Sequence, residues 1–201
     1  MSEGEVNVAR RRFLIGATSV VGGVGVIGAA VPFVRSWSPS AKARALGAPV
    51  RIDIGKLRPG ELLGPMPEWR GRPIFVVQRT EKALEALSEI EEALADPDSE
   101  RDQQPAYAAN IWRAREERKA VSVLIGLCTH LGCSPAFYGR LEPEPFDANW
   151  RGGYFCACHG SRFDLSGRVY AGVPAPTNLV VPPYMFESEN VIVVGQDEET
   201  G

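Results

Sequence analysis

Every cysteine and every histidine of this chain lies in one short stretch of its sequence. The 201 residues include only four cysteines and two histidines, and all six fall between Cys128 and His159. Random placement would scatter residues this scarce over the whole chain. Because clustered cysteine and histidine indicate a metal site, the fold has to gather this stretch around a ligand.

The six residues form two short loops. The first loop reads CTHLGC, at residues 128–133, and the second reads CACHGS, at residues 156–161. Each loop can present one thiolate and one imidazole to a metal. Their separation suits two hairpin-like loops at one tip of a β domain. Three glycines would let the backbone turn tightly there, namely Gly132, Gly153 and Gly160.

The residues alone leave the choice of ligands open. In the first loop, either Cys128 or Cys133 could partner the histidine. In the second loop, Cys156 is sterically better placed than Cys158, which is adjacent to the histidine. Two cysteines and two histidines also suit a structural zinc site, but that interpretation leaves two cysteines without a role.

The amino-terminal segment carries no charge over a long run. Residues 13–34 contain no charged side chain. As a helix they would extend about 33 Å, enough to cross a hydrocarbon core of roughly 30 Å. The run is longer than the apolar part of a cleaved signal peptide, which favours a retained membrane anchor. The string RRRFL, which starts at Arg10, resembles the twin-arginine export signal, so we expect the amino terminus inside and the remainder outside.

The remainder of the chain predicts a mainly β fold with antiparallel sheets. Residues 36–49 are small and polar with Pro and Gly, which is typical of a linker. Runs rich in Val and Ile predict strands at residues 50–54, 73–78, 121–127 and 190–195. Apolar residues at helical spacing over 84–94 predict a helical insertion that ends at Asp96-Pro97. A second, shorter helix is expected around residues 107–117.

The overall charge excludes one class of partner. A net charge of −3 and a pI near 5.5 argue against nucleic-acid binding, which usually leaves a basic footprint. The acidic runs at residues 81–100 and 197–199 are typical of solvated surface.

The paired loops resemble the double motif of the Rieske iron–sulfur family, C-T-H-L-G-C followed by C-x-C-H-G-S. The export signal, anchor, linker, insertion and Pro-rich loop narrow this resemblance to the Rieske subunit of proteobacterial cytochrome bc complexes. It implies one 2Fe–2S cluster per subunit, with two cysteines on one iron and two histidines on the other. The implied ligands are Cys128, Cys156, His130 and His159. It also implies a disulfide between Cys133 and Cys158, which an oxidising compartment would keep formed.

The resemblance also implies roles for neighbours of the cluster. Ser161 matches a serine whose hydroxyl donates to a cluster sulfur. High-potential members commonly carry a tyrosine two residues later, whose hydroxyl reaches a cysteine sulfur. This chain has Phe163 there, so we expect a lower potential. Leu131 is a candidate contact at the quinol-site docking surface. The family's G-P-A-P loop is one residue longer here, at 172–176, and Pro174 is expected to stiffen it.

The implied reaction is quinol oxidation with reduction of a c-type cytochrome and proton release on the periplasmic side. His159 is expected to contact the quinol and accept its proton, and His130 is expected to titrate too. Expected partners are cytochrome b, a c-type cytochrome and membrane lipid, in a dimeric complex. The small subunit of an exported oxidase such as arsenite oxidase, and a soluble Rieske ferredoxin or oxygenase domain, share the cluster motif. The long anchor, the linker and the insertion favour the bc-type assignment.

The sequence therefore divides into four expected parts. They are a cytoplasmic amino terminus with the export signal (1–12), a transmembrane anchor in the bacterial inner membrane (13–35), a hinge linker (36–49) and the Rieske head (50–201). A cluster-binding subdomain is expected at about 126–181. If residues 41–47 switched between helix and extended chain, they would supply roughly 12 Å of travel to the head. The alternative is a passive tether.

Overall fold

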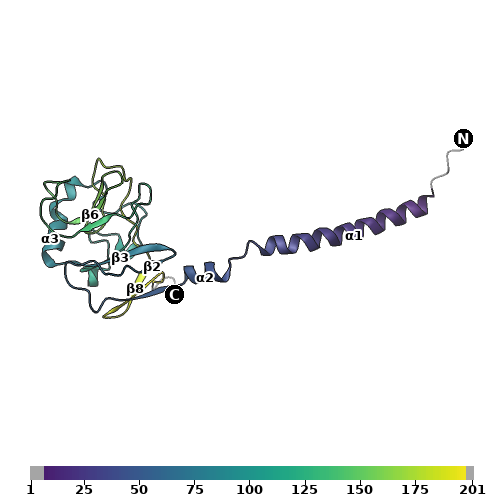
Figure 1. The fold of residues 1–201 in the computed structure, drawn as a ribbon, viewed down its shortest axis with the longest axis horizontal. Coiled ribbons are helices and arrows are strands. Elements are labelled where there is room, and N and C mark those ends of the chain that lie inside the picture. Colours follow the sequence, from purple (N-terminus) through teal and green to yellow (C-terminus); the bar gives the residue numbers. More distant parts are fainter. Residues whose placement is uncertain (1–6, 198–201) are drawn as a thin grey trace. The chain divides into compact units, whose positions relative to one another are not determined.

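The computed structural model describes residues 7–197. Residues 1–6 of the expected amino-terminal part and 198–199 of the acidic tail therefore lie outside the described residues. The chain divides into two compact units, Met1–Ala45 and Leu46–Gly201. The first unit is helical over most of its described residues, whereas all the strands of the described residues lie in the second (Figure 1).

The first unit contains a long apolar helix, α1, which spans Val8–Arg35 and includes the whole uncharged run. The side chain of Asn7 caps its start by accepting from the Arg10 N–H at 3.1 Å. No side chain of α1 is buried, although Phe13, Val21 and others are large and apolar. Within residues 7–197, α1 is the one helix long and apolar enough to cross a membrane. A helix that is apolar all round and unburied by its own protein needs a lipid environment.

A second helix, α2 (Ala41–Gly47), lies inside the segment predicted as a linker. Ser40 caps the start of α2 with two acceptors. Its Oγ accepts from the Ala43 N–H at 3.1 Å, and its carbonyl accepts from the Arg44 N–H at 3.0 Å. Alanine-rich sequence favours helix once such a cap is present. The segment is therefore helical over the residues for which a helix-to-extended switch was considered.

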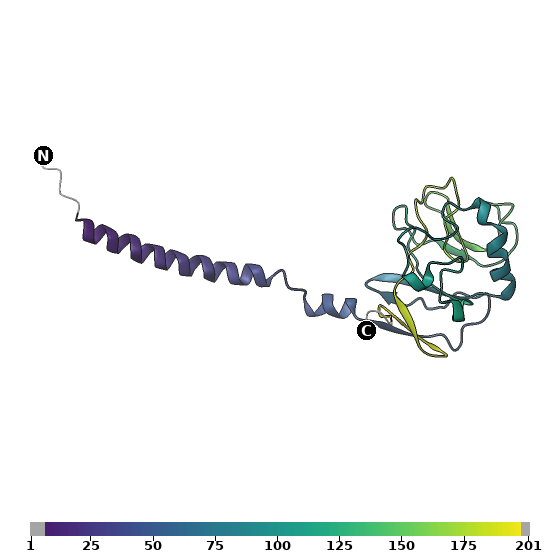
Figure 2. The same cartoon turned by 180° about the vertical axis from the view of Figure 1, so that it is seen from behind.

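The head is built from antiparallel three-stranded sheets, as predicted. The first sheet has the order β1-β9-β8, with bounds Val50–Asp53, Val191–Val194 and Tyr184–Ser188. The second has the order β2-β3-β4, with bounds Glu68–Trp69, Arg72–Gln78 and Val121–Ile125. The third has the order β5-β6-β7, with bounds Ala136–Tyr138, Gly153–Cys156 and Ser161–Asp164. The first sheet joins the start of the head to its end, since blue β1 pairs with yellow β9 (Figures 1 and 2).

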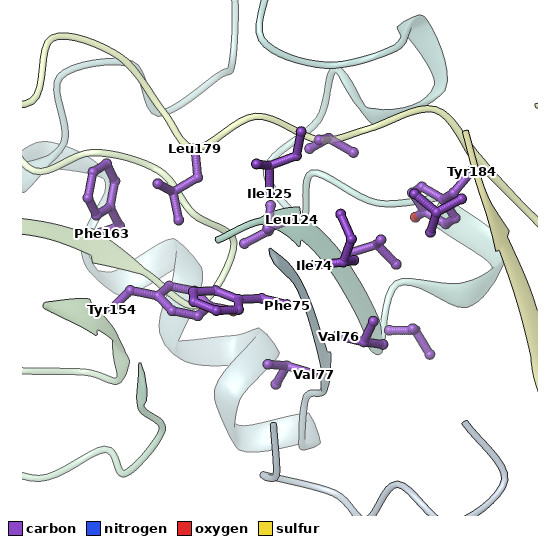
Figure 3. Packing of buried hydrophobic residues seen from close by; sticks show 14 of the residues in the cluster. Ile74, Phe75, Val76, Val77, Leu124, Ile125, Tyr154, Phe163, Leu179 and Tyr184 are labelled. Carbon is purple, nitrogen blue, oxygen red and sulfur yellow. The ribbon is translucent and has the colours of Figure 1, made fainter. Parts of the chain in front are cut away.

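The main core contains buried residues from all three sheets. The ring of Tyr154 on β6 stacks on that of Phe75 on β3, with centroids 5.4 Å apart (Figure 3). The same buried cluster includes Cys128, Cys156 and Phe163. The residues expected to carry the chemistry therefore stand on a packed apolar base rather than on a mobile surface loop.

The expected helical insertion is present but shorter. Helix α3 spans Glu81–Glu89, starts at the Thr80 cap, and is followed by the 3₁₀ turn η1, Glu91–Ala93. Residues Leu84 and Leu87 belong to α3, whereas Ile90 and Leu94 lie beyond the helix end and pack in a separate cluster with Trp150 and Tyr170.

The prediction of a second helix around 107–117 is wrong. That segment contains only two short 3₁₀ turns, η2 (Ala106–Ala108) and η3 (Glu116–Arg118), with Arg113 at φ 48° between them. The side chain of Asn110 donates to two backbone carbonyls of the segment and accepts from a third residue's N–H. Such local side-chain bonds compete with the helical pattern. The buried Arg113 guanidinium, whose pKa burial lowers to about 10, donates to the Leu179 carbonyl at 2.6 Å and holds the irregular path.

Candidate metal centre

The second loop is a tight hairpin between β6 and β7. Cys156 ends β6 and lies opposite Ser161, which begins β7. The Gly160 N–H closes the turn by donating to the Cys156 carbonyl at 2.9 Å. Gly160 has φ 80°, a backbone conformation that favours glycine. The sequence therefore places a thiol and a hydroxyl side by side at the base of one turn.

The first loop has the same local closure in a different setting. The Gly132 N–H donates to the Cys128 carbonyl at 2.9 Å, with Gly132 at φ 81°, and the Cys128 N–H donates to the Cys133 carbonyl at 2.8 Å. The loop leads from β4 to β5, which belong to different sheets. The expectation of a hairpin is therefore wrong for this loop, because β4 pairs with β3 and not with β5.

A disulfide between Cys133 and Cys158 joins the two loops, as the resemblance implied. It leaves Cys128 and Cys156 as free, buried thiols. The structure thus answers the question that the residues alone left open: in the first loop it is Cys128 that keeps a free sulfur.

The two free thiols lie together at the inner side of the loops. The Cys128 thiol is within hydrogen-bonding reach of the Cys156 thiol and the Ser161 hydroxyl, and burial raises its pKa above the usual value. The Cys156 sulfur also lies within 4.8 Å of both disulfide sulfurs. Since thiolates are the metal-binding form, a positively charged group has to displace these protons when it binds.

The two histidines lie together at the outer side. The rings of His130 and His159 have centroids 4.7 Å apart and meet edge to face at 87°. His130 is half-buried, whereas His159 is exposed. A buried pair of thiols and an outward pair of imidazoles, each drawn from both loops, form a donor set that fits a 2Fe–2S cluster with different ligands on its two irons.

The loop after β7 packs against both cluster-binding loops. The Ala175 N–H donates to the Ser161 Oγ at 3.0 Å, and the Thr129 hydroxyl donates to the Thr177 carbonyl at 2.6 Å. Ala175 is buried, while Pro174 is exposed. The contacts of Thr129 and Ala175 were not predicted from the sequence. The only available signal for them was their position inside the motif and inside the Pro-rich loop.

The two remaining candidates differ in accessibility. Leu131, next to His130, is 70% exposed although it is large and apolar. Phe163 is 0% exposed and lies opposite Tyr154 across β6 and β7. The first is available to a partner, whereas the second can act only through the interior of the site.

The comparisons with known proteins agree with this geometry. The family described as "Rieske [2Fe-2S] domain" matches residues 97–184, and the one described as "Ubiquitinol-cytochrome C reductase Fe-S subunit TAT signal" matches residues 1–40. The ubiquinol-cytochrome c reductase iron-sulfur subunit of Allochromatium vinosum is 51% identical over 98% of this chain and 93% of that protein. The chain belongs to the family of Rieske iron–sulfur subunits of ubiquinol–cytochrome c reductase.

Further relatives carry the same description. The ubiquinol-cytochrome c reductase iron-sulfur subunit of Blastochloris viridis is 41% identical over 96% of this chain and 97% of that protein. A solved chain of a hyperthermophilic respiratory Complex III aligns with a TM-score of 0.44 and 28% identity, over 90% of this chain and 98% of that one. As a member of this family, the chain binds one 2Fe–2S cluster and serves as an electron-transfer subunit of a cytochrome bc complex, held by a single-pass helix.

Proposed function

We propose that Cys128 and Cys156 bind one iron of the cluster and that His130 and His159 bind the other. The observation that carries this assignment is the segregation of the donors. The two thiols are free, buried and in mutual contact, whereas the two imidazoles meet at the outer side. The remaining two cysteines are bonded to each other.

When bound, the cluster would supply a one-electron acceptor between a quinol and a c-type cytochrome. His159, the more exposed of the two rings, accepts a hydrogen bond from the quinol hydroxyl at its free ring nitrogen and then holds the proton. Leu131 contributes an exposed apolar contact at the docking surface. Ser161 donates its hydroxyl hydrogen toward the Cys128 sulfur. This hydrogen bond stabilises the more negative, reduced state of the cluster.

A spectroscopic experiment tests the ligand set directly. The chain has only two histidines, so nitrogen-15-labelled histidine places the label at His130 and His159 alone. Pulsed electron-spin spectroscopy of the reduced protein should show coupling to two labelled nitrogens. Coupling to no labelled nitrogen, or a purified protein that contains zinc in place of iron, would refute the assignment.

The partners and the orientation are part of the same proposal. Cytochrome b and a c-type cytochrome are the proposed neighbours in a dimeric complex, with quinol as the electron donor. The twin arginines support an amino terminus in the cytoplasm and a head in the periplasm, with residues 13–35 in membrane lipid. A quinol-site inhibitor added to reduced membranes should shift the electron-spin spectrum. An unchanged spectrum would mean that the cluster does not contact the proposed quinol site, and would contradict this part of the proposal.

The linker at 36–49 is proposed as a hinge between this membrane part and the head at 50–201, whose cluster-binding subdomain spans about 126–181. The helix α2 supports this function, because its seven residues would lengthen by roughly 12 Å on becoming extended. Such travel would let a reduced head leave the quinol site and reach the cytochrome.

A matched pair of proline variants tests the hinge. Ala45→Pro removes an N–H inside α2 and breaks the helix, whereas Ala41→Pro occupies the first helical position, which tolerates proline. We expect slow turnover in the complex for Ala45→Pro and near-normal turnover for Ala41→Pro. Equal turnover in both variants would support a passive tether.

A further inference from the structure

A buried asparagine connects the helical insertion to the loop that covers the site. Asn178 is 0% exposed, and its Oδ1 accepts from the Val169 N–H at 2.8 Å. Its Nδ2 donates to the Asp96 carbonyl at 3.1 Å and to the Asp96 Oδ2 at 3.3 Å. One side chain thus holds together two segments that are 82 residues apart in the sequence.

The far end of this connection is itself fixed. Asp96 is buried, and its carboxylate also accepts from the Glu100 N–H at 3.0 Å and the Arg101 N–H at 3.3 Å. The neighbouring Pro97 carbonyl accepts from Arg168, which in turn forms a fully buried ion pair with Asp164 at 2.7 Å. The turn that closes the insertion is therefore a rigid support and not a mobile surface loop.

The near end leads directly to the site. Asn178 follows Thr177, whose carbonyl accepts from the Thr129 hydroxyl in the first cluster-binding loop. Three residues before Asn178, the Ala175 N–H donates to the Ser161 Oγ. A short segment anchored at Asn178 therefore touches both loops, and at Ser161 it touches a hydroxyl within reach of the Cys128 sulfur.

We propose that Asn178 is a positioning residue that sets the hydrogen bond of Ser161 and so tunes the reduction potential, with Asp96 of the insertion as its support. The inference rests on the proposed role of Ser161. The Ala175 N–H donates to the Ser161 oxygen and so fixes the orientation of the Ser161 hydroxyl. The hydroxyl hydrogen then stays free to point at the Cys128 sulfur. Without the Asn178 contacts the segment moves, the rotor is released, and the reduced state loses part of its stabilisation.

A purely structural role for Asn178 makes a different prediction. Buried amides are expensive to leave unpaired, so Asn178 would then serve only to satisfy Val169 and Asp96. Its loss would lower stability and leave the potential unchanged. The midpoint potential of the full-length holoprotein, with thermal stability measured in parallel, separates the two roles.

The decisive variant is Asn178→Leu, which keeps the branched side-chain shape and removes all these hydrogen bonds. We expect its midpoint potential to fall in the same direction as that of Ser161→Ala, by a smaller amount. In a Ser161→Ala background, Asn178→Leu should cause no further fall. Hydrogen exchange of the peptide that contains the Ala175 amide should accelerate. Ser99→Ala is the matched control, since buried Ser99 meets the same amide only at 3.5 Å, and we expect lower stability with an unchanged potential.

The outcomes distinguish the two proposals. If Ser161→Ala leaves the potential unchanged, the role of Ser161 fails and this inference fails with it. If Ser161→Ala shifts the potential but Asn178→Leu does not, or shifts it equally in both backgrounds, this inference alone is overturned. Should Asn178→Leu fail to fold, Asp96→Asn carries the same test. Its amide has one oxygen for contacts that now use two, so we expect a smaller fall that again vanishes in the Ser161→Ala background.

Discussion

The missing hydroxyl at Phe163 gives the sharpest prediction about the potential. Phe163 lies in the same buried cluster as Cys128 and Cys156 and is fully shielded from water. The family resemblance implies a tyrosine at this position in members of high potential. We therefore expect Phe163→Tyr to add one hydrogen-bond donor close to the cysteine sulfurs and to raise the midpoint potential.

The size of the effect follows from the burial. A hydrogen bond to a charged group contributes about 1.5–3 kcal/mol, and a dry surrounding keeps it at the strong end. The bond forms in both oxidation states, so only the difference counts, and we take it as about 1 kcal/mol. For a one-electron couple a tenfold change equals 59 mV, so the midpoint should rise by roughly 40 mV.

The same substitution should lower stability. Adding an oxygen to a fully packed position costs about 1–3 kcal/mol through overpacking. A rise in potential together with reduced stability would therefore point to the hydrogen bond, because overpacking accounts for the lost stability but supplies no donor that raises the potential.

Redox titration of the holoprotein, followed by circular dichroism or electron-spin signal, measures the midpoint. Phe163→Leu is the matched control, since it disturbs the packing but supplies no donor, and we expect its potential to stay close to that of the parent. An unchanged or lowered midpoint in Phe163→Tyr would refute the reasoning. An equal rise in Phe163→Leu would show that packing, and not the hydroxyl, sets the potential.

Three further predictions concern stability. Replacing Cys133 and Cys158 by serine opens a bridge across a sequence separation of 25, and urea unfolding should show a loss of about 3.5 kcal/mol; a loss below about 1 kcal/mol would contradict this. Asp164→Asn leaves its arginine partner buried without a counter-charge, and thermal unfolding should show a loss of about 3–5 kcal/mol, whereas a near-parental Tm would contradict it. Burial raises the pKa of Tyr154 and Tyr184 above the ordinary 10.0. The unfolded chain therefore loses these two protons at a lower pH than the folded chain does. The contribution of the two groups to the free energy of unfolding is complete below pH 10 and is lost as the pH rises above it. Tyrosinate absorbance should therefore appear for these two only together with unfolding, and a separate earlier rise would count against it.

The site itself was largely predictable because its determinants are local. Cys128 and Gly132, and likewise Cys156 and Gly160, lie within one turn of each other, so a six-residue string holds both the donor and the backbone closure. The strands at 50–54, 73–78, 121–127 and 190–195 were predictable for a similar reason, since each is a run of Val and Ile. The short strands β2, β5, β6, β7 and β8 were missed, because two to five residues are too few to establish an alternating pattern.

The segment around 107–117 shows where local reasoning fails. Its residues tolerate a helix, and its sequence has no obvious break. The deciding contacts are those of Arg113, which donates to the Leu179 carbonyl across a separation of 66 residues. A buried guanidinium with several carbonyl acceptors outweighs the few tenths of a kcal/mol per residue that separate helix propensities. No pattern within the segment encodes that competition.

The same contrast separates what binds the cluster from what tunes it. Ligand binding needs residues that neighbour each other in the chain, so a short motif indicates the site reliably. Tuning needs Ser161 held by Ala175, and the loop of Ala175 held by Asn178 on Asp96, a contact that exists only after the intervening chain has folded. Two chains with identical cluster motifs can therefore differ in potential through residues far from either loop. It follows that the motif predicts which cluster this chain carries, while the helical insertion and the Pro-rich loop determine how readily that cluster accepts an electron.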